Sequence, residues 1–202
     1  MNRFSAFLVP AGLVALAGCA PEVKTEAVQA EMVPMELRLP VVGDKKVWKE
    51  GEGQFESVVV SFAGVVVSTE TSKGCSYTQE AGFAPTQKWT NCTPFDDGTQ
   101  NSTKNGAIFP LAVGNSVSYA VTGSNVKGND WSTTRNCSVK GTARVTVPAG
   151  TFDTYHVNCS DDWTSRDYYV SPELGTSVLF RRVGNDASRN TVQELISFTP
   201  GV

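Results

Sequence analysis

The stretch Val145-Thr146-Val147-Pro148-Ala149-Gly150-Thr151-Phe152-Asp153-Thr154-Tyr155 decides the fold, because it joins two long strand-forming runs by a tight reversal. Alternating, valine-rich sequence favours extended backbone, whereas proline presets its own φ and glycine accepts a positive φ without steric cost. We therefore expect one strand over residues 131–147, a turn at 148–150 and a returning strand over residues 152–159. A hairpin of this length belongs to an antiparallel sheet.

Residues 45–202 repeat this pattern of short alternating runs separated by turns. Val117, Tyr119 and Val121 alternate with small or polar residues, and the last run, 192–198, does the same. Glycine is abundant at 18 residues in the chain, which is typical of many strands joined by tight turns rather than of helices. We predict an all-β fold: a single antiparallel meander of about ten strands, closed or strongly curled into a barrel, with a β-sandwich as the alternative.

A polar run interrupts these strands between residues 95 and 106. It reads Phe-Asp-Asp-Gly-Thr-Gln-Asn-Ser-Thr-Lys-Asn-Gly. Clusters of Asp, Asn, Ser, Thr and Gly between strand-forming runs are typical of loops, so we expect a solvated surface loop here. Asp96 and Asp97 lack the alternate ligand spacing and the closing glutamate of a calcium-binding loop.

The first 18 residues have the three parts of a secretion signal. Arg3 supplies the positive start, residues 4–16 form an apolar run, and small residues precede the cleavage point. The run is shorter than the roughly 20 apolar residues that span a bilayer. Leu16-Ala17-Gly18-Cys19 resembles the lipobox of bacterial lipoproteins at all four positions. An ordinary signal peptide or a short uncleaved anchor is the alternative.

This resemblance implies removal of residues 1–18 and acylation of the Cys19 thiol, so that acyl chains hold the protein on a membrane. Residues 19–44 contain three prolines and no regular period, and would form a flexible tether to a single β domain at 45–202. Ala20 stands where an aspartate favours inner-membrane retention in enteric-type bacteria. The resemblance therefore implies an outer-membrane lipoprotein facing the periplasm, with the cell surface or the inner membrane as alternatives.

Four more cysteines lie in the predicted β domain: Cys75, Cys92, Cys137 and Cys159. An even number of cysteines in an exported domain predicts two disulfides, and three connectivities are possible. We favour Cys75–Cys92 and Cys137–Cys159 because each pairing closes a short loop. A reversal near residue 149 places Cys159 opposite Val139 or Gly141, so the second pairing requires a bulge or strong twist in the outgoing strand.

A second resemblance rests on the hairpin itself. Read as V-x-V-P-A-G-x-F, it resembles a hairpin that recurs in uncharacterised bacterial envelope proteins. There it follows a P-L-x-V-G strand, as at 110–114, precedes a Y-Y-V-x-P-x-x-G strand, as at 168–175, and is followed by an E-L-I-S-F-like run, as at 194–198. Some of these domains are thought similar to the curled sheets of lipoprotein localisation factors, which implies a concave face that binds acyl chains. Turn architecture alone also explains the motif.

Charge and motifs exclude several classes of function. Removing residues 1–18, which carry Arg3 and no acidic residue, leaves 184 residues and changes the net charge from −3 to −4. A mildly acidic chain without a basic cluster does not predict a nucleic-acid partner. No glycine-rich phosphate loop or dinucleotide fingerprint is present, so no cofactor is predicted. With no Cys-x-x-Cys pair and one histidine, no metal site is predicted either.

Candidate site residues are few. His156 is the one imidazole base, and Ser160, Asp161 and Asp162 follow it closely. Strand alternation turns His156 away from the core and no G-x-S-x-G elbow is present, so no catalytic residue is assigned. The tryptophans are often flanked by polar residues and are candidates for lining a ligand groove, with core packing as the alternative: Trp48, Trp89, Trp131 and Trp163.

The sequence thus predicts a lipid-anchored envelope protein whose non-catalytic β domain binds a partner, either a lipid or an envelope protein, or an apolar ligand. The alternative is an envelope hydrolase acting on polysaccharide or ester, using His156 or a carboxylate pair. Geometry discriminates between them, because a hydrolase requires His156 to meet a serine or aspartate within hydrogen-bond reach in a concave pocket.

Overall fold

The fold is known from a computed structural model that describes residues 25–28 and 31–202. Thirteen strands form one sheet, in which consecutive strands pair from β2 to β13 and β13 pairs back with β2. The strands are β1 (Thr25–Glu26), β2 (Lys45–Glu50), β3 (Gly53–Ala63), β4 (Val66–Thr71), β5 (Ser76–Glu80), β6 (Thr86–Thr90), β7 (Gly98–Ala107), β8 (Ser116–Asn125), β9 (Asp130–Val147), β10 (Gly150–Ser160), β11 (Thr164–Ser171), β12 (Thr176–Gly184) and β13 (Thr191–Thr199).

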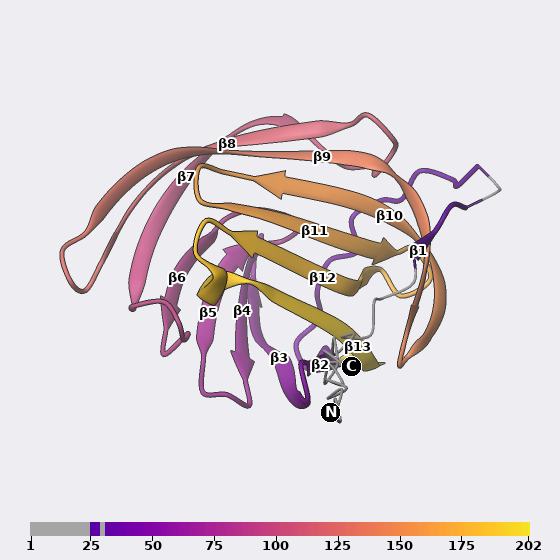
Figure 1. Cartoon of the computed structure of the whole chain (residues 1–202), viewed down its shortest axis with the longest axis horizontal. Helices are drawn as coiled ribbons and strands as arrows, with labels where there is room; N and C mark the ends of the chain where they lie inside the picture. The colour runs from indigo at the N-terminus through magenta and orange to yellow at the C-terminus, as the bar shows by residue number, and fades with distance from the viewer. Residues whose placement is uncertain (1–24, 29–30) are drawn as a thin grey trace, which may run out of the picture.

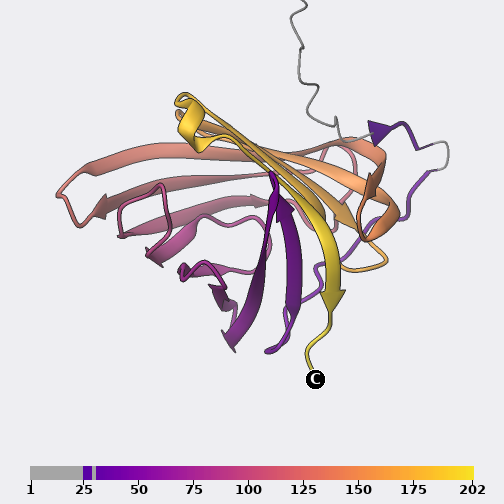
Figure 2. The ribbon, with the colours of Figure 1, turned by 60° about the horizontal axis from the view of Figure 1, so that its bottom comes forward.

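The predicted antiparallel meander is confirmed as a closed barrel of twelve strands, β2 to β13, with β1 added to the edge of β9. Figure 1 shows β9 to β12 running across the view and β3 to β6 standing steeply to them. Figure 2, turned by 60°, shows β2 and β3 running steeply to β9–β12. One short 3₁₀ turn, η1 (Ala187–Arg189), follows β12. Among the described residues, no helix is long and apolar enough to cross a membrane.

The deciding hairpin is β9–β10, and its turn lies at Pro148 and Ala149 as expected. Pairing is regular from Val147 opposite Gly150 to Gly141 opposite His156. Val139 then pairs with Val157, so Lys140 is an extra residue on β9. This is a β-bulge, and it shifts every later pair by one residue.

The bulge brings Cys137 directly opposite Cys159. The structure accordingly contains the two expected disulfides, Cys75–Cys92 and Cys137–Cys159, with Cα–Cα distances of 4.5 Å and 4.0 Å. A hairpin without the extra residue would place Cys159 opposite a position other than Cys137. The extra residue in β9 is therefore what places Cys137 within bonding distance of Cys159.

The bulge also distributes β9 between two hydrophobic cores. Cys137 and Val139 belong to one core, whereas Val145 and Val147, beyond the extra residue, belong to the other. Val139 and Val145 lie on opposite faces of the hairpin, because their partners Val157 and Phe152 are five positions apart on β10.

The described part of the N-terminal segment, residues 31–44, lies against the barrel. Met35 is 9% exposed and forms a two-way backbone bridge with Leu111, which is fully buried. The Tyr155 hydroxyl donates to the carbonyl oxygens of Met32 and Val33, at 3.0 and 2.9 Å. This segment was expected to be part of a tether, and the structure shows that it covers apolar barrel residues.

The predicted polar loop at 95–106 is wrong for most of its length, because residues 98–107 form strand β7. Ten consecutive residues of β7 pair with β8, from Gly98 opposite Asn125 to Ala107 opposite Ser116. The strand has no apolar signal because most of its residues are exposed, while its one buried residue, Gly98, lies under the Trp89 ring. On the neighbouring strand β8, Gly123 lies under Trp131 in the same way. Small and polar residues are required where two indoles cover the sheet.

Candidate functional site

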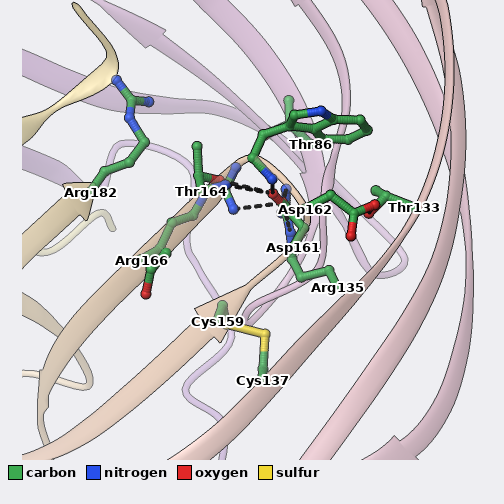
Figure 3. A network of polar contacts seen from close by, with 12 residues as sticks. Thr86, Thr133, Arg135, Cys137, Cys159, Asp161, Asp162, Thr164, Arg166 and Arg182 are labelled. Atoms are coloured by element: carbon green, nitrogen blue, oxygen red, sulfur yellow. Dashed lines mark hydrogen bonds and ion pairs between the residues drawn. A yellow bond between two sulfur atoms is a disulfide. The ribbon is translucent and has the colours of Figure 1, made fainter. Parts of the chain in front are cut away.

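Asp161, in the turn between β10 and β11, is the centre of a dense polar network. Its Oδ1 accepts hydrogen bonds from the backbone N–H groups of Trp163 and Thr164, at 3.2 and 3.0 Å, and from the Thr164 hydroxyl at 3.1 Å. Its Oδ2 accepts from Arg135 at 3.1 Å and from Arg166 at 2.8 Å. Figure 3 shows both guanidinium groups directed at this carboxylate, close to the Cys137–Cys159 disulfide.

The two arginines keep Asp161 ionised. The side chain is 3% exposed, and burial by itself raises the pKa of a carboxyl group. The positive charge and hydrogen bond of Arg166, followed by the charge of Arg135, outweigh burial and hold the pKa of Asp161 at about 2. With Arg135 Nε, which also donates to Oδ2 at 3.3 Å, six donors bond this carboxylate, and they fix the β10–β11 turn and the direction of both guanidinium groups.

Positive charge at this site exceeds what Asp161 neutralises. Arg166 on β11 lies directly opposite Arg182 on β12, and like charges in that position repel. Burial, and then the neighbouring Arg166, lower the pKa values of both Arg135 and Arg182. Glu50 raises the pKa of Arg182, but its carboxylate accepts hydrogen bonds from other side chains: Lys73, Thr191 and Gln193.

We call Arg135, Arg166 and Arg182 the arginine cluster, and Phe95 packs against one of its members, Arg182. The guanidinium carbon of Arg182 lies 5.0 Å from the Phe95 ring centroid, and that of Arg189, in η1, lies 5.6 Å from it. Arg182 also donates through Nε to the carbonyl oxygen of Arg189 at 2.6 Å. The loop between β6 and β7 thus brings an aromatic ring onto charges from the opposite part of the barrel.

Two of the four candidate tryptophans come together on the same side of the sheet as Arg135. Trp89 and Trp131 have ring centroids 5.9 Å apart, and Trp131 lies four residues before Arg135 on β9. The Trp89 indole donates to the Asp96 carbonyl oxygen at 2.7 Å, next to Phe95. An aromatic pair and an arginine cluster are therefore linked through one loop.

The other two tryptophans lie elsewhere. Trp48 is 7% exposed in the second core and donates to the Ser57 hydroxyl at 3.2 Å, so it packs as a core residue. Trp163 is 37% exposed beside Asp161. The predicted acylation site, Cys19, and the whole Leu16–Cys19 motif lie outside the described residues.

His156 bonds Asp167 on the neighbouring strand rather than its sequence neighbours Ser160, Asp161 and Asp162. Its Nε2 lies 2.8 Å from Asp167, and its ring stacks on Tyr169 with centroids 4.7 Å apart. Asp167 accepts a second hydrogen bond from Asn158, whose amide also donates to Ser165. These hydrogen bonds cross strands β10 and β11 on the face opposite Val157 and Cys159. The serine in this group, Ser165, contacts Asn158 rather than the imidazole.

Two surface clefts of the described residues do not have the lining of an apolar-ligand site. One, of about 460 Å³, lies between residue Met32, the β9–β10 hairpin and the β11–β12 turn; its lining is mainly polar and includes Arg144, Asp153 and Glu173. The other, of about 360 Å³, is lined largely by asparagine and serine. Apolar ligands require predominantly hydrophobic linings.

The arginine cluster was missed at the level of sequence, although one signal could have found it. Once Cys137 is paired with Cys159, stepping two residues outward along both strands places Arg135 beside Asp161 on the same face. The positions of Arg166 and Arg182 depend on the registers of two further hairpins, which carry no covalent marker.

No family model and no curated protein sequence matches this chain. The solved structures that match include the hypothetical lipoprotein YmcC from Escherichia coli K12. It has 9% sequence identity and a TM-score of 0.48, with 78% of this chain and 85% of that chain covered. The case for a function therefore rests on the residues of this chain.

Proposed function

We propose that this chain is a lipid-anchored envelope protein whose non-catalytic barrel binds an anionic partner through the arginine cluster. The observation that carries the proposal is the direct pairing of Arg166 with Arg182, in a partly buried region where one ionised carboxylate serves Arg135 and Arg166. Repulsion of this kind costs stability in the free protein. A bound anion removes that cost and gains charge-assisted hydrogen bonds.

Phosphate and carboxylate groups fit this arrangement best. A guanidinium group offers a planar fork of donors that matches both anions, and arginine stacked on an aromatic ring is held in place before the ligand arrives. Trp89, Trp131 and Phe95 extend the surface with aromatic rings, which suits a partner that carries an apolar or sugar portion beside its charge. The partner class is an anionic lipid headgroup, glycan or protein segment of the envelope.

The binding site is tested with inorganic phosphate as the probe and the full chain in detergent as the protein. We expect phosphate to raise the Tm of the wild type. Arg182→Gln should weaken the apparent affinity for phosphate, obtained from the dependence of Tm on phosphate concentration, at least tenfold. In the absence of phosphate, Arg182→Gln should change the Tm little, because relief of the repulsion with Arg166 offsets the lost contacts with Phe95 and Arg189. Arg181→Gln is the matched control: its guanidinium lies over Tyr169, on the other face of β12.

A loss of phosphate response in Arg181→Gln equal to that in Arg182→Gln would assign the effect to overall charge. An unchanged response in Arg182→Gln would exclude the arginine cluster as the site. Sulfate, with similar geometry and charge, should compete with phosphate, whereas chloride at equal ionic strength should not.

The anchor follows from Leu16-Ala17-Gly18-Cys19 and is tested separately. Expressed in a bacterial host, the chain should lose residues 1–18 and gain the mass of a diacylglyceryl group, with or without an amide-linked acyl chain. Cys19→Ser should keep its leader and lack the lipid, because the modification requires a sulfur nucleophile. Intact mass and fractionation between the two membranes report both results; an unmodified wild-type Cys19 would refute lipidation, and an outer-membrane location is expected from Ala20.

A further inference from the structure

Exposed apolar side chains gather on the N-terminal segment that crosses one end of the barrel. Within ten residues, Val33, Leu39, Val41 and Val42 are 84%, 51%, 39% and 49% exposed. We call these four side chains the apolar rim. The segment that carries them lies beside the turn between β11 and β12 and beside the described C-terminus, since Arg38 is next to Gly175 and the carbonyl oxygen of Val42 is near Gly201. Met32, at its start, lines a cleft together with Thr151 of the β9–β10 hairpin.

The apolar rim is held firmly, so its exposure is built into the fold. Arg38 forms two hydrogen bonds to Asp44, at 2.7 and 2.9 Å, and the Asp44 carboxylate also accepts from the backbone N–H groups of Val41 and Gly201. Asp44 is 4% exposed. Met35, between Val33 and Leu39, anchors the other half of the segment on Leu111. Four exposed apolar side chains within ten residues of a segment held in this way make the segment a candidate contact site.

Strand β1 limits how far the proposed lipid anchor can lie from this end of the barrel. Strand β1 pairs Thr25 with Val145 and Glu26 with Arg144, so the polypeptide joins the barrel near the β9–β10 turn. Thr25 follows Cys19 by six positions, which span at most about 22 Å when fully extended. Figure 1 shows β1 at the end of the barrel that residues 31–44 cross.

We propose that the apolar rim rests on the lipid bilayer that holds the acyl chains of Cys19. This rests on the proposed lipidation and adds an orientation to it: the end of the barrel that carries the rim faces the membrane. Because β10 has 11 residues and rises about 3.3 Å per residue, Asp161 lies roughly 35 Å from the β9–β10 turn. The arginine cluster then faces away from the anchoring membrane.

The contact is apolar rather than electrostatic. Glu31 and Glu36 are exposed on the same segment, and the Arg144 side chain is paired with Asp153 at 2.7 Å. Carboxylates next to the rim disfavour an anionic lipid surface, so the proposal predicts docking on zwitterionic bilayers that high salt does not reverse.

The test uses the full acylated chain in phosphatidylcholine vesicles whose acyl chains are brominated. Val33→Cys and Val41→Cys each introduce one free thiol, because Cys19 is acylated and the other four cysteines form disulfides. The thiol is labelled with an environment-sensitive fluorophore. Val126→Cys is the matched control. Val126 is 75% exposed in the turn before β9, and that turn is at the opposite end of β9 from the β9–β10 hairpin turn.

We expect labels at residues 33 and 41 to shift to shorter wavelength and to lose at least half of their emission to bromine, while the label at residue 126 changes little. Vesicle flotation is measured in parallel. Flotation without quenching at residue 33, or with equal quenching at 33 and 126, overturns the orientation and leaves the anchor intact. Failure of the acylated chain to float overturns the anchor, and the orientation with it.

Discussion

Asp161 shows how a single residue positions the candidate site. Its carboxylate ends β10, caps the turn that begins β11 and fixes the directions of Arg135 and Arg166. Asp44 has the same role at the other end of the barrel, where Arg38 and two backbone N–H groups hold its pKa at about 2 despite burial. In both cases one ionised side chain replaces a set of apolar contacts that a turn cannot supply.

Asp161 predicts a dependence of stability on pH. Its pKa is about 2 in the folded protein and about 3.8 in the unfolded chain, so its contribution is complete above pH 4 and is lost as the pH falls towards 2. Asp161→Asn should lower the free energy of unfolding by about 2 kcal/mol at pH 7, and the difference from the wild type should shrink below pH 4. Urea unfolding between pH 2 and pH 7 measures both.

Asp162→Asn is the control for that experiment, since Asp162 is exposed and bonds the Thr133 hydroxyl instead of an arginine. It should follow the wild-type profile. A constant difference between Asp161→Asn and the wild type down to pH 2 would show that Asp161 stabilises the turn without its charge.

At the scale of the element, the β9–β10 hairpin contains both what sequence predicts well and what it does not. Alternation, the Pro-Ala-Gly turn and the cysteine count correctly indicate the hairpin, the meander and both disulfides. Gly141 is the local signal of the bulge, because a glycine inside a strand often marks one, and the extra residue, Lys140, lies next to it. The extra residue places Val145 and Val147 in a different core from Val139, although simple alternation along the strand would put all three on one face.

Strand β7 shows a second physical limit. Polar, glycine-rich sequence predicts a loop, because nothing within β7 itself favours a strand. The strand forms because β7 pairs with β8 and because Trp89 and Trp131 cover the sheet there, and these contacts involve residues outside β7. The arginine cluster was hidden for the same reason, since its members come from three strands and meet through registers set elsewhere.

The tryptophan-covered glycines give a prediction about packing between strands. A Cβ atom at Gly123 would lie 2.5 Å from the Trp131 ring, whereas one at Gly141 would meet nothing within 4 Å. Gly123→Ala should therefore displace the indole, cost about 1–3 kcal/mol and change the tryptophan emission and near-UV circular dichroism. Gly141→Ala should alter stability by less than about 0.5 kcal/mol. Equal effects of the two substitutions would mean that the Trp131 ring yields without cost.

At the scale of the molecule, residues 31–44 connect the barrel to everything that precedes it. Met35 of this segment is buried in the first core, and the Met32 carbonyl oxygen accepts a hydrogen bond from the Tyr155 hydroxyl. A hydrogen bond from the Gly201 N–H to Asp44 joins the segment to the C-terminal residues. A closed barrel has no free edges, but its ends still expose core side chains unless something covers them. In this chain the segment leading from the proposed anchor covers one of those ends, so attachment and stability share the same residues.

This arrangement predicts that the barrel strands alone are less stable than the longer chain. A chain of residues 45–202 should lose about 3 kcal/mol or more relative to one of residues 31–202, since Met35 burial and its two backbone hydrogen bonds to Leu111 are removed. Calorimetry and amide hydrogen exchange at Leu111 measure the loss. Tyr155→Phe in the longer chain should cost only about 1 kcal/mol, because one hydroxyl is removed while Met35 stays buried. Equal Tm values for the two chains would show that residues 31–44 rest on the barrel without stabilising it.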